Sequence, residues 1–375
     1  MQYNEVIGQE EIKARLRQEL KDGRVPHARL FRGPEGCGKL PMALAYATAL
    51  LCHNPKDGEA CGECSSCRMA AAWAHPDLHF VFPVFKRKGQ SGDAVSDQFL
   101  KEWREQLKDS LYFDRLSWLA RIEIENQQAH IGVGESEQIL HKLSIVASQG
   151  GRKVMMIWLP ELMNISAANK LLKILEEPPT DTVFLLVAEH AEKMLATILS
   201  RTQITDFRQL TQTDLEQVLL SRHGLQPEDA AAIAHMSEGS YIKALRQIYL
   251  NENEAVFFDM FVLLMRLSYM RKIKDMHQWA DQVASWGRER QKNFMEYCQR
   301  LVRENFISNF HRKELNYMSR READFSVKFG RFINERNVIG MMEELSLAQR
   351  DIEQNVNAKM VFFDFALKTI MLLKQ

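Results

Sequence analysis

The stretch GRKVMMIWLPELMNISAANKLLKILEEPPTDTVFLLVAEHAEKMLATILSRT, residues 151–202, decides the fold of this chain. Its apolar runs Val154–Ile157 and Val183–Ala188 predict two buried strands, and the spacing in Ser166–Leu175 predicts a helix between them. That helix stops at a pair of prolines, because proline cannot continue a helix. Strands without polar alternation, joined by a helix, are typical of a parallel sheet covered on both faces. The stretch therefore predicts an α/β domain.

The same stretch resembles the AAA+ clamp-loader family. In that family a helix reads AANALLKxLEEPP and an SRC motif follows it. Here Ala167–Pro179 reads AANKLLKILEEPP, and Ser200-Arg201-Thr202 follows. The likeness is specific because it extends over thirteen consecutive positions. It implies an α/β AAA+ P-loop domain with a parallel sheet, then a small helical lid domain and an all-α C-terminal collar domain.

The resemblance implies three domains with boundaries that can be set on this sequence. We expect an AAA+ P-loop-like domain over residues 1–206, with a cysteine module at 52–67 and an insertion at about 86–128 relative to the family pattern. The lid domain is expected at 207–250 and the collar, or oligomerisation domain, at 251–375. The polar run 251–254 predicts a linker between them. Apolar residues at helical spacing after it fit an all-helical domain.

Composition narrows the functional class. A chain of 375 residues is long enough for two or three domains. The formal net charge is zero, so contact with DNA would need a local basic patch. The polar start predicts no secretion signal, and no run reaches the roughly 18 apolar residues of a membrane span. We expect a cytoplasmic protein with no membrane partner.

Residues 33–40, GPEGCGKL, nearly match the phosphate-binding loop G-x-x-x-x-G-K-[ST]. Gly33, Gly36 and Gly38 would let backbone N–H groups face phosphate oxygens, and Lys39 would pair with the outer phosphates. A hydroxyl that ligates Mg²⁺ is expected at the last position, but Leu40 stands there. The loop is therefore a degenerate site for ATP or ADP, or an empty loop kept for its turn.

The second metal position of a P-loop ATPase is also missing. Alignment of KVMMI with the family's KVxII puts Trp158 and Leu159 where the family carries an Asp and a Glu. Neither side chain binds a metal. Glu161 is expected to lie too far along the chain to replace them. We expect no Mg²⁺ site, which argues against ATP hydrolysis.

Four cysteines follow the P-loop with the spacing C-x8-C-x2-C-x2-C: Cys52, Cys61, Cys64 and Cys67. Two-residue gaps let neighbouring sulfurs converge on one ion, and four thiolates suit structural Zn²⁺. His53 could substitute as a ligand, and four free thiols are the alternative to a metal site. The same spacing occurs in gamma-type and delta-prime-type clamp-loader subunits.

The resemblance gives Arg201 a role in trans. In the SRC motif of clamp loaders the arginine reaches the terminal phosphate of ATP on a neighbouring subunit, as an arginine finger. A surface arginine that caps a helix or pairs with an acid is the alternative.

A chain with the finger but without hydrolysis chemistry resembles the delta-prime type of DNA polymerase III clamp-loader subunit. The implied partners are the gamma/tau and delta subunits and, through the complex, the sliding clamp and primed DNA. An active ATPase subunit of gamma/tau type and a zinc-dependent DNA-binding protein are the alternative functions.

Overall fold

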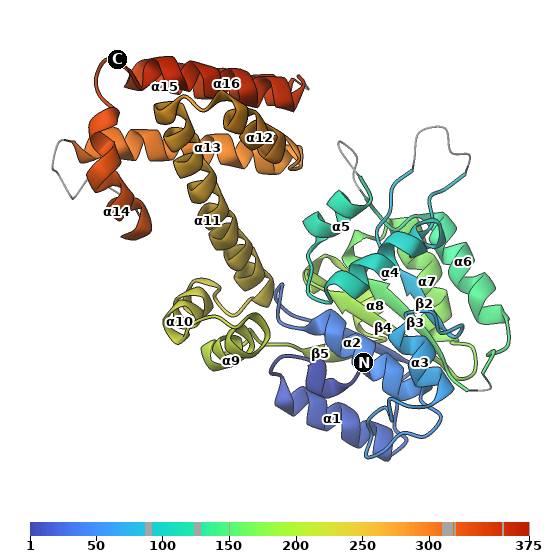
Figure 1. The fold of residues 1–375 in the computed structure, drawn as a ribbon. Helices are drawn as coiled ribbons and strands as arrows, with labels where there is room; N and C mark the ends of the chain where they lie inside the picture. The colour runs from blue at the N-terminus through green and yellow to red at the C-terminus, as the bar shows by residue number, and fades with distance from the viewer. Residues whose placement is uncertain are drawn as a thin grey trace. The chain divides into compact units, whose positions relative to one another are not determined.

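The computed structural model forms two compact units, Met1–Gln247 and Ile248–Gln375 (Figure 1). The residues that it describes are 1–86, 92–123, 129–149, 151–309, 318, 320–354 and 356–374. Helix α11 (Tyr241–Met270) begins in the first unit and ends in the second. The linker predicted at 251–254 is wrong, because these residues lie within α11. The three predicted domain ranges stay predictions.

The first unit is built on one parallel sheet of five strands in the order β2-β3-β4-β1-β5. The strands are β1 (Ala28–Arg32), β2 (Leu78–Val81), β3 (Lys153–Trp158), β4 (Thr182–Ala188) and β5 (Gln203–Asp206). The predicted strand pair is adjacent in register, with Val154 opposite Val183. The parallel α/β sheet expected from residues 151–202 is confirmed.

Side chains on the two faces of the sheet enter two separate cores. On β3 and β4, alternate residues such as Met156 and Leu185 belong to the core that includes α2, whereas Met155 and Phe184 belong to the core under α7. Both faces are buried, and every residue of these two strands is buried. This is why the strands carry no polar alternation.

Helices cover both faces of this sheet (Figure 1). The α-helices of the first unit, before α11, are α1 (Glu10–Lys21), α2 (Lys39–Leu51), α3 (Ser65–Ala71), α4 (Leu100–Asp109), α5 (Arg115–Arg121), α6 (Val133–Ser144), α7 (Ile165–Glu176), α8 (Ala196–Leu199), α9 (Gln212–His223) and α10 (Pro227–Met236). Short 3-10 helices are η1 (Tyr3–Glu5), η2 (Ser96–Phe99), η3 (Pro160–Leu162) and η4 (Ala191–Lys193). All residues of α2 are buried, since it is apolar on every side.

The described part of the predicted insertion packs into the core of the first unit. Trp103 on α4 stacks on Phe82 with ring centres 4.3 Å apart, and Trp118 on α5 meets the same Trp103 edge-on at 5.2 Å. Neither tryptophan is exposed. These aromatic side chains therefore stabilise this unit. Residues 87–91 and 124–128 of the insertion lie outside the described residues.

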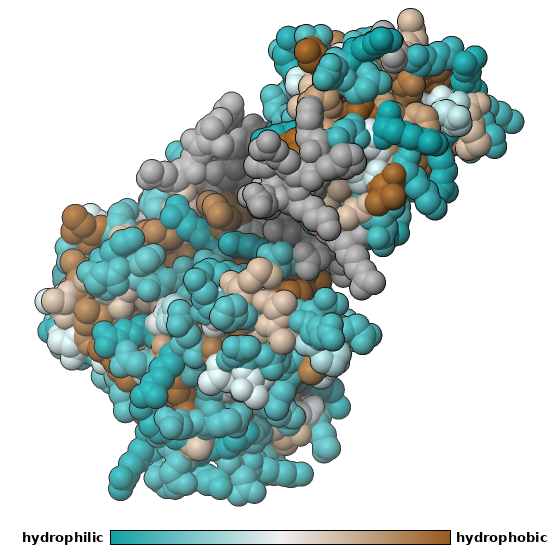
Figure 2. Space-filling model, turned by 90° about the vertical axis from the view of Figure 1, so that its left-hand side faces the viewer, coloured by the Kyte–Doolittle hydropathy of each residue, from teal (hydrophilic) through white to brown (hydrophobic). Residues whose placement is uncertain are grey.

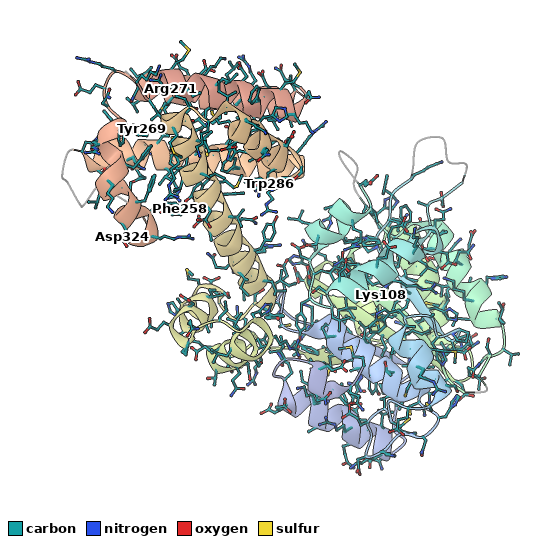
Figure 3. The ribbon with its side chains drawn as sticks, viewed as in Figure 1. Lys108, Phe258, Tyr269, Arg271, Trp286 and Asp324 are labelled. Atoms are coloured by element: carbon teal, nitrogen blue, oxygen red, sulfur yellow. The ribbon has the colours of Figure 1, made fainter. Side chains whose placement is uncertain are left out.

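Among the described residues of the second unit, the regular elements are all helices joined by turns and short loops. Its helices after α11 are α12 (Ile273–Ala284), α13 (Arg288–Ser308), α14 (Arg320–Phe329), η6 (Gly330–Phe332), α15 (Val338–Glu353) and α16 (Ala358–Leu372). Helix α13 packs along α15, and α12 along α16, around one apolar core. Phe258 on α11, labelled in Figure 3, lies against Arg321 of α14, with the guanidinium carbon 5.1 Å from the ring centre.

The surface is mainly polar on the face drawn in Figure 2, where brown apolar residues are scattered among hydrophilic ones. Within the described ranges, no helix is both long enough and apolar enough to span a membrane.

Candidate functional site

The degenerate phosphate-binding loop connects β1 to the start of α2. Gly38 precedes the helix with φ +94°, a left-handed value that glycine adopts without strain. Lys39 is 5% exposed, and its Nζ donates to the carbonyl oxygens of Gly33 at 2.8 Å and Pro34 at 2.5 Å. The ammonium group is thus held by the carbonyls of its own loop.

Residues of the predicted lid domain contact this loop. The N–H of Tyr241 donates to the carbonyl of Gly36 at 3.2 Å. A Cβ atom at Gly36 would stand 2.1 Å from Oγ of Ser240, so only glycine fits there. Lys243 forms an ion pair with Glu238 at 2.5 Å, whereas Ile242 lines the pocket beside the loop.

That pocket is nearly filled by side chains of this chain. Its lining comes from the P-loop and the start of α2, the segment between α4 and α5, the ends of β3 and β4, and the start of α11: Gly36, Gly38, Lys39, Leu40, Pro41, Leu111, Tyr112, Phe113, Trp158, Val187, Glu189 and Ile242. A volume of about 20 Å³ is left, which suffices for one water molecule, whereas small-molecule sites span roughly 300–1,000 Å³.

Apolar side chains occupy both positions where the sequence lacks the expected metal ligands. Leu40 is 5% exposed and Trp158 3% exposed, and Trp158 lies 5.1 Å from the ring of Phe113. Glu161 does not line the pocket. Its Oε1 accepts the N–H groups of Glu189 at 2.8 Å and His190 at 2.9 Å, so this carboxylate binds the backbone after β4.

Sequence reasoning missed Glu189, the one carboxylate among the residues that line the pocket. Burial raises the pKa of Glu189, and the nearby Lys39 opposes that shift. Its position immediately after β4 was the available signal, since polar residues at the carboxyl ends of parallel strands gather at one edge of the sheet. Tyr112 and Phe113 were also missed as pocket residues, because the path of the insertion cannot be read from its composition.

The four cysteines come together as their spacing predicts. Their sulfur atoms all lie within 4.8 Å of one another, and Sγ of Cys52 is 3.5 Å from that of Cys61 and 4.0 Å from that of Cys64. Four thiolates at about 2.3 Å from one tetrahedral zinc ion would stand about 3.8 Å apart. The observed spacing therefore fits such an ion. His53 is outside this group.

Backbone N–H groups point at these sulfurs. Those of Cys61, Cys64 and Cys67 donate to the preceding cysteine sulfurs at 3.3, 3.4 and 3.4 Å. Hydrogen bonds from the N–H groups of Glu63 and Cys64 lower the pKa of Cys61 to about 6, which favours the thiolate that binds a metal.

The cysteine loop is anchored to the N-terminal part of the chain. Glu59 forms an ion pair with Arg17 of α1 at 2.7 Å and accepts the N–H of Tyr3 at 2.6 Å. Gly58 has φ +75°, and a Cβ there would stand 2.2 Å from the carbonyl of Arg17. The module therefore connects α1 to α3, which begins directly after Cys64.

Arg201 lies at the surface, two residues after the end of α8 at Leu199. Its Nη1 donates to the carbonyl of Thr197 at 3.0 Å, and its Nη2 lies 2.7 Å from Oε1 of Glu176. The side chain is 35% exposed and does not line the pocket beside Lys39. Arg201 and the degenerate P-loop thus lie in different parts of the first unit.

The comparisons with known proteins agree with one another. DNA polymerase III subunit delta' of Pseudomonas aeruginosa is 34% identical over 175 residues, which cover 47% of this chain and 41% of that protein. Subunit delta' of Yersinia pestis is 32% identical over 201 residues, 53% of this chain and 44% of that protein. Subunit tau of Bacillus subtilis is 30% identical over 209 residues, 56% of this chain and 29% of that protein.

Each match covers less than half of the relative's own length. The sequence profile of the family described as "DNA polymerase III, delta subunit" matches residues 8–211. This range contains the parallel sheet, the P-loop, the cysteine cluster and Arg201. Because it spans more than half of the 375 residues, the chain belongs to the DNA polymerase III, delta subunit family.

Proposed function

We propose that this chain is a delta-prime-type subunit of the DNA polymerase III clamp loader that hydrolyses no ATP itself and acts on ATP held by a neighbouring subunit. Its partners in this proposal are the gamma/tau and delta subunits, and the complex loads the sliding clamp onto primed DNA in the cytoplasm. The delta' and tau names among its relatives support this assignment.

One observation carries the proposal: the chain's own pocket offers no metal ligands at the two expected positions, while Arg201 stands outside it. Leu40 and Trp158 are apolar and buried. Phosphoryl transfer in P-loop enzymes depends on a bound Mg²⁺ between the phosphate oxygens. A surface guanidinium needs no such site in its own chain.

The proposed contribution of Arg201 is electrostatic. Its guanidinium is charged at every physiological pH and can bind two phosphate oxygens at once. Arginine fingers of this kind accelerate phosphoryl transfer by roughly 10³–10⁵-fold. To reach a neighbour's phosphate, Arg201 must leave Glu176, and this exposed pair is weak enough to exchange for a more highly charged partner.

We further propose that Cys52, Cys61, Cys64 and Cys67 hold a structural zinc ion. Four sulfur ligands leave no open coordination position, so the ion would fix the loop rather than take part in catalysis. The ion pair between Glu59 and Arg17 would then tie the fixed loop to α1.

The test is the reconstituted clamp-loader complex with Arg201→Ala in this subunit. The expected result is normal assembly with strongly reduced ATP-dependent clamp loading. Arg24→Ala is the matched control, since Arg24 is an exposed arginine beyond the end of α1. Clamp loading by Arg201→Ala at the rate of the control would overturn the finger assignment. ATP turnover by the purified chain alone, abolished by Lys39→Ala, would instead favour an active gamma/tau-type subunit.

A further inference from the structure

We propose that the segment Leu111–Asp114 is a built-in ligand of the P-loop pocket, which it occupies in place of a nucleotide. This inference rests on the pocket assigned above to the P-loop fold, and it holds whether or not Arg201 acts in trans. The segment belongs to the predicted insertion and lies between α4 and α5. Three consecutive side chains make separate contacts with the parts of the protein that would surround a nucleotide.

Tyr112 is held by the N-terminal segment, the P-loop and the lid together. Its hydroxyl oxygen accepts the N–H of Ile7 at 3.0 Å. A Cβ atom at Gly38 would lie 3.3 Å from the same oxygen, and the ring meets Tyr241 edge-on with centres 4.9 Å apart. Only 7% of Tyr112 is exposed. Tyr112 therefore satisfies the backbone donor of Ile7, in the segment that precedes α1.

Phe113 closes the side of the pocket where a metal would be expected. Its ring lies 5.1 Å from Trp158 and 5.6 Å from Trp103, and 6% of the residue is exposed. Trp158 and Phe113 thus belong to one continuous aromatic cluster. Trp158, at the expected metal position, and Phe113, from the predicted insertion, therefore pack against each other and bury each other's rings.

Asp114 fastens the segment to the lid. The residue is 2% exposed and forms an ion pair with Arg246 on α11, which also lies 3.8 Å from Oε1 of Glu35 in the P-loop. The other oxygen of Asp114 caps α5 by accepting the N–H of Ser117 at 2.8 Å. A buried carboxylate needs such partners, because an unpaired charge there would be strongly unfavourable. Through Arg246, Asp114 therefore connects the segment to α11 and to Glu35 of the P-loop.

The volume of the pocket indicates that a nucleotide and the segment Leu111–Asp114 would compete for it. With the segment in place, about 20 Å³ remains beside Lys39, so a nucleotide and the segment cannot both occupy the pocket. A ligand that must first expel Tyr112 and Phe113 binds more weakly by the factor that describes how rarely the pocket opens. Removing the two rings should therefore tighten nucleotide binding by the same factor.

The experiment is titration of the purified full-length chain with a fluorescent ADP analogue, without Mg²⁺ because Leu40 offers no ligand for it. We expect the double variant Tyr112→Ala/Phe113→Ala to bind at least tenfold more tightly than the wild type, whose binding should not saturate within the titration. That gain should disappear when Lys39→Ala is added. Leu116→Ala is the matched control, because Leu116 is 69% exposed on the next helix and does not line the pocket.

A second variant guards against misfolding of the double variant. Tyr112→Phe keeps the ring but removes the oxygen that accepts the Ile7 N–H, so hydrogen exchange at the Ile7 amide should become faster while the amides of the sheet stay protected. Tight Lys39-dependent ADP binding by the wild type would overturn the proposal. So would a folded double variant that gains no binding, or unchanged exchange at Ile7 in Tyr112→Phe. These outcomes concern the isolated chain and leave the Arg201 test in the complex unaffected.

Discussion

Arg201 and Glu176 form an ion pair at the surface, with Nη2 of the arginine 2.7 Å from Oε1 of the glutamate. The glutamate is the last residue of α7, and the arginine follows α8, so the pair joins the two motifs by which the chain resembles clamp loaders. Both side chains keep substantial exposure, 35% and 49%. The pair therefore holds the guanidinium at the surface without burying it.

Glu176→Gln should leave both stability and clamp loading intact. An exposed pair of this kind contributes only about 0–1 kcal/mol, so the free energy of unfolding should change by no more than that. In the proposed role of Arg201, loss of the competing carboxylate would free its guanidinium for a neighbour's phosphate, so the clamp-loading rate should be equal to that of the wild type or higher. Urea unfolding and loading assays check this, with Glu177→Gln, an exposed neighbour, as control. A loss of activity as large as that of Arg201→Ala would contradict it.

The cysteine cluster should contain one zinc ion per chain, measured by elemental analysis of the purified protein. Cys64→Ser should lower this content, whereas Cys298→Ser should keep it, since Cys298 lies outside the cluster. If the free zinc concentration is about 1,000 times the dissociation constant of the site, removal of zinc by a chelator should lower the free energy of unfolding by about 4 kcal/mol. Unchanged thermal unfolding after complete chelation would show that the thiols hold no structural ion.

Lys39→Ala should affect stability rather than ATP turnover. The side chain donates hydrogen bonds to the carbonyl groups of Gly33 and Pro34. Loss of these hydrogen bonds leaves buried acceptors unpaired, which should lower the free energy of unfolding by about 1–3 kcal/mol. Neither the wild type nor the variant should hydrolyse ATP when isolated. Denaturant unfolding and a phosphate-release assay check these points, with the exposed Lys193→Ala as control. Phosphate release that depends on Lys39 would contradict this prediction.

His79 on β2 should make the protein less stable in acid. Burial lowers its pKa from 6.5 to about 4, with Lys142 contributing in the same direction. Because the folded pKa lies below the unfolded one, the stability is fully present above about pH 6.5 and falls as the pH drops toward about pH 4. The loss from this group between about pH 7 and about pH 5 is about 2 kcal/mol.

His79→Asn should remove that part of the pH dependence, and urea unfolding at the two pH values measures it. His235→Asn is the control, because His235 is exposed on α10. An equal pH dependence in wild type and His79→Asn would assign the acid sensitivity to other groups.

Much of the first unit follows from sequence pattern alone. The buried strands around Met156 and Leu185 were predicted because fully apolar short runs have few alternatives in a soluble α/β domain, and cysteine spacing predicted which sulfurs meet. The family motif located Arg201. These features are local, or are repeated signals over many residues.

What could not be predicted depends on contacts between distant segments. Tyr112 lies 105 residues from Ile7 in the sequence, yet the two share a hydrogen bond. No periodicity encodes that pairing. The continuity of α11 was missed because a polar run was interpreted as a linker, although Asn and Glu can lie on a helix whose other positions pack well.

The unbroken course of α11 has a practical consequence for anyone who wishes to study the halves of this protein apart. A cut at the boundary after Gln247 would sever a helix seven residues from its start and leave carbonyl groups on one fragment and amides on the other without partners. It would also leave Arg246, the ion-pair partner of Asp114, next to a new chain end where the helix frays. Fragments should therefore overlap through this helix, each carrying several of its turns.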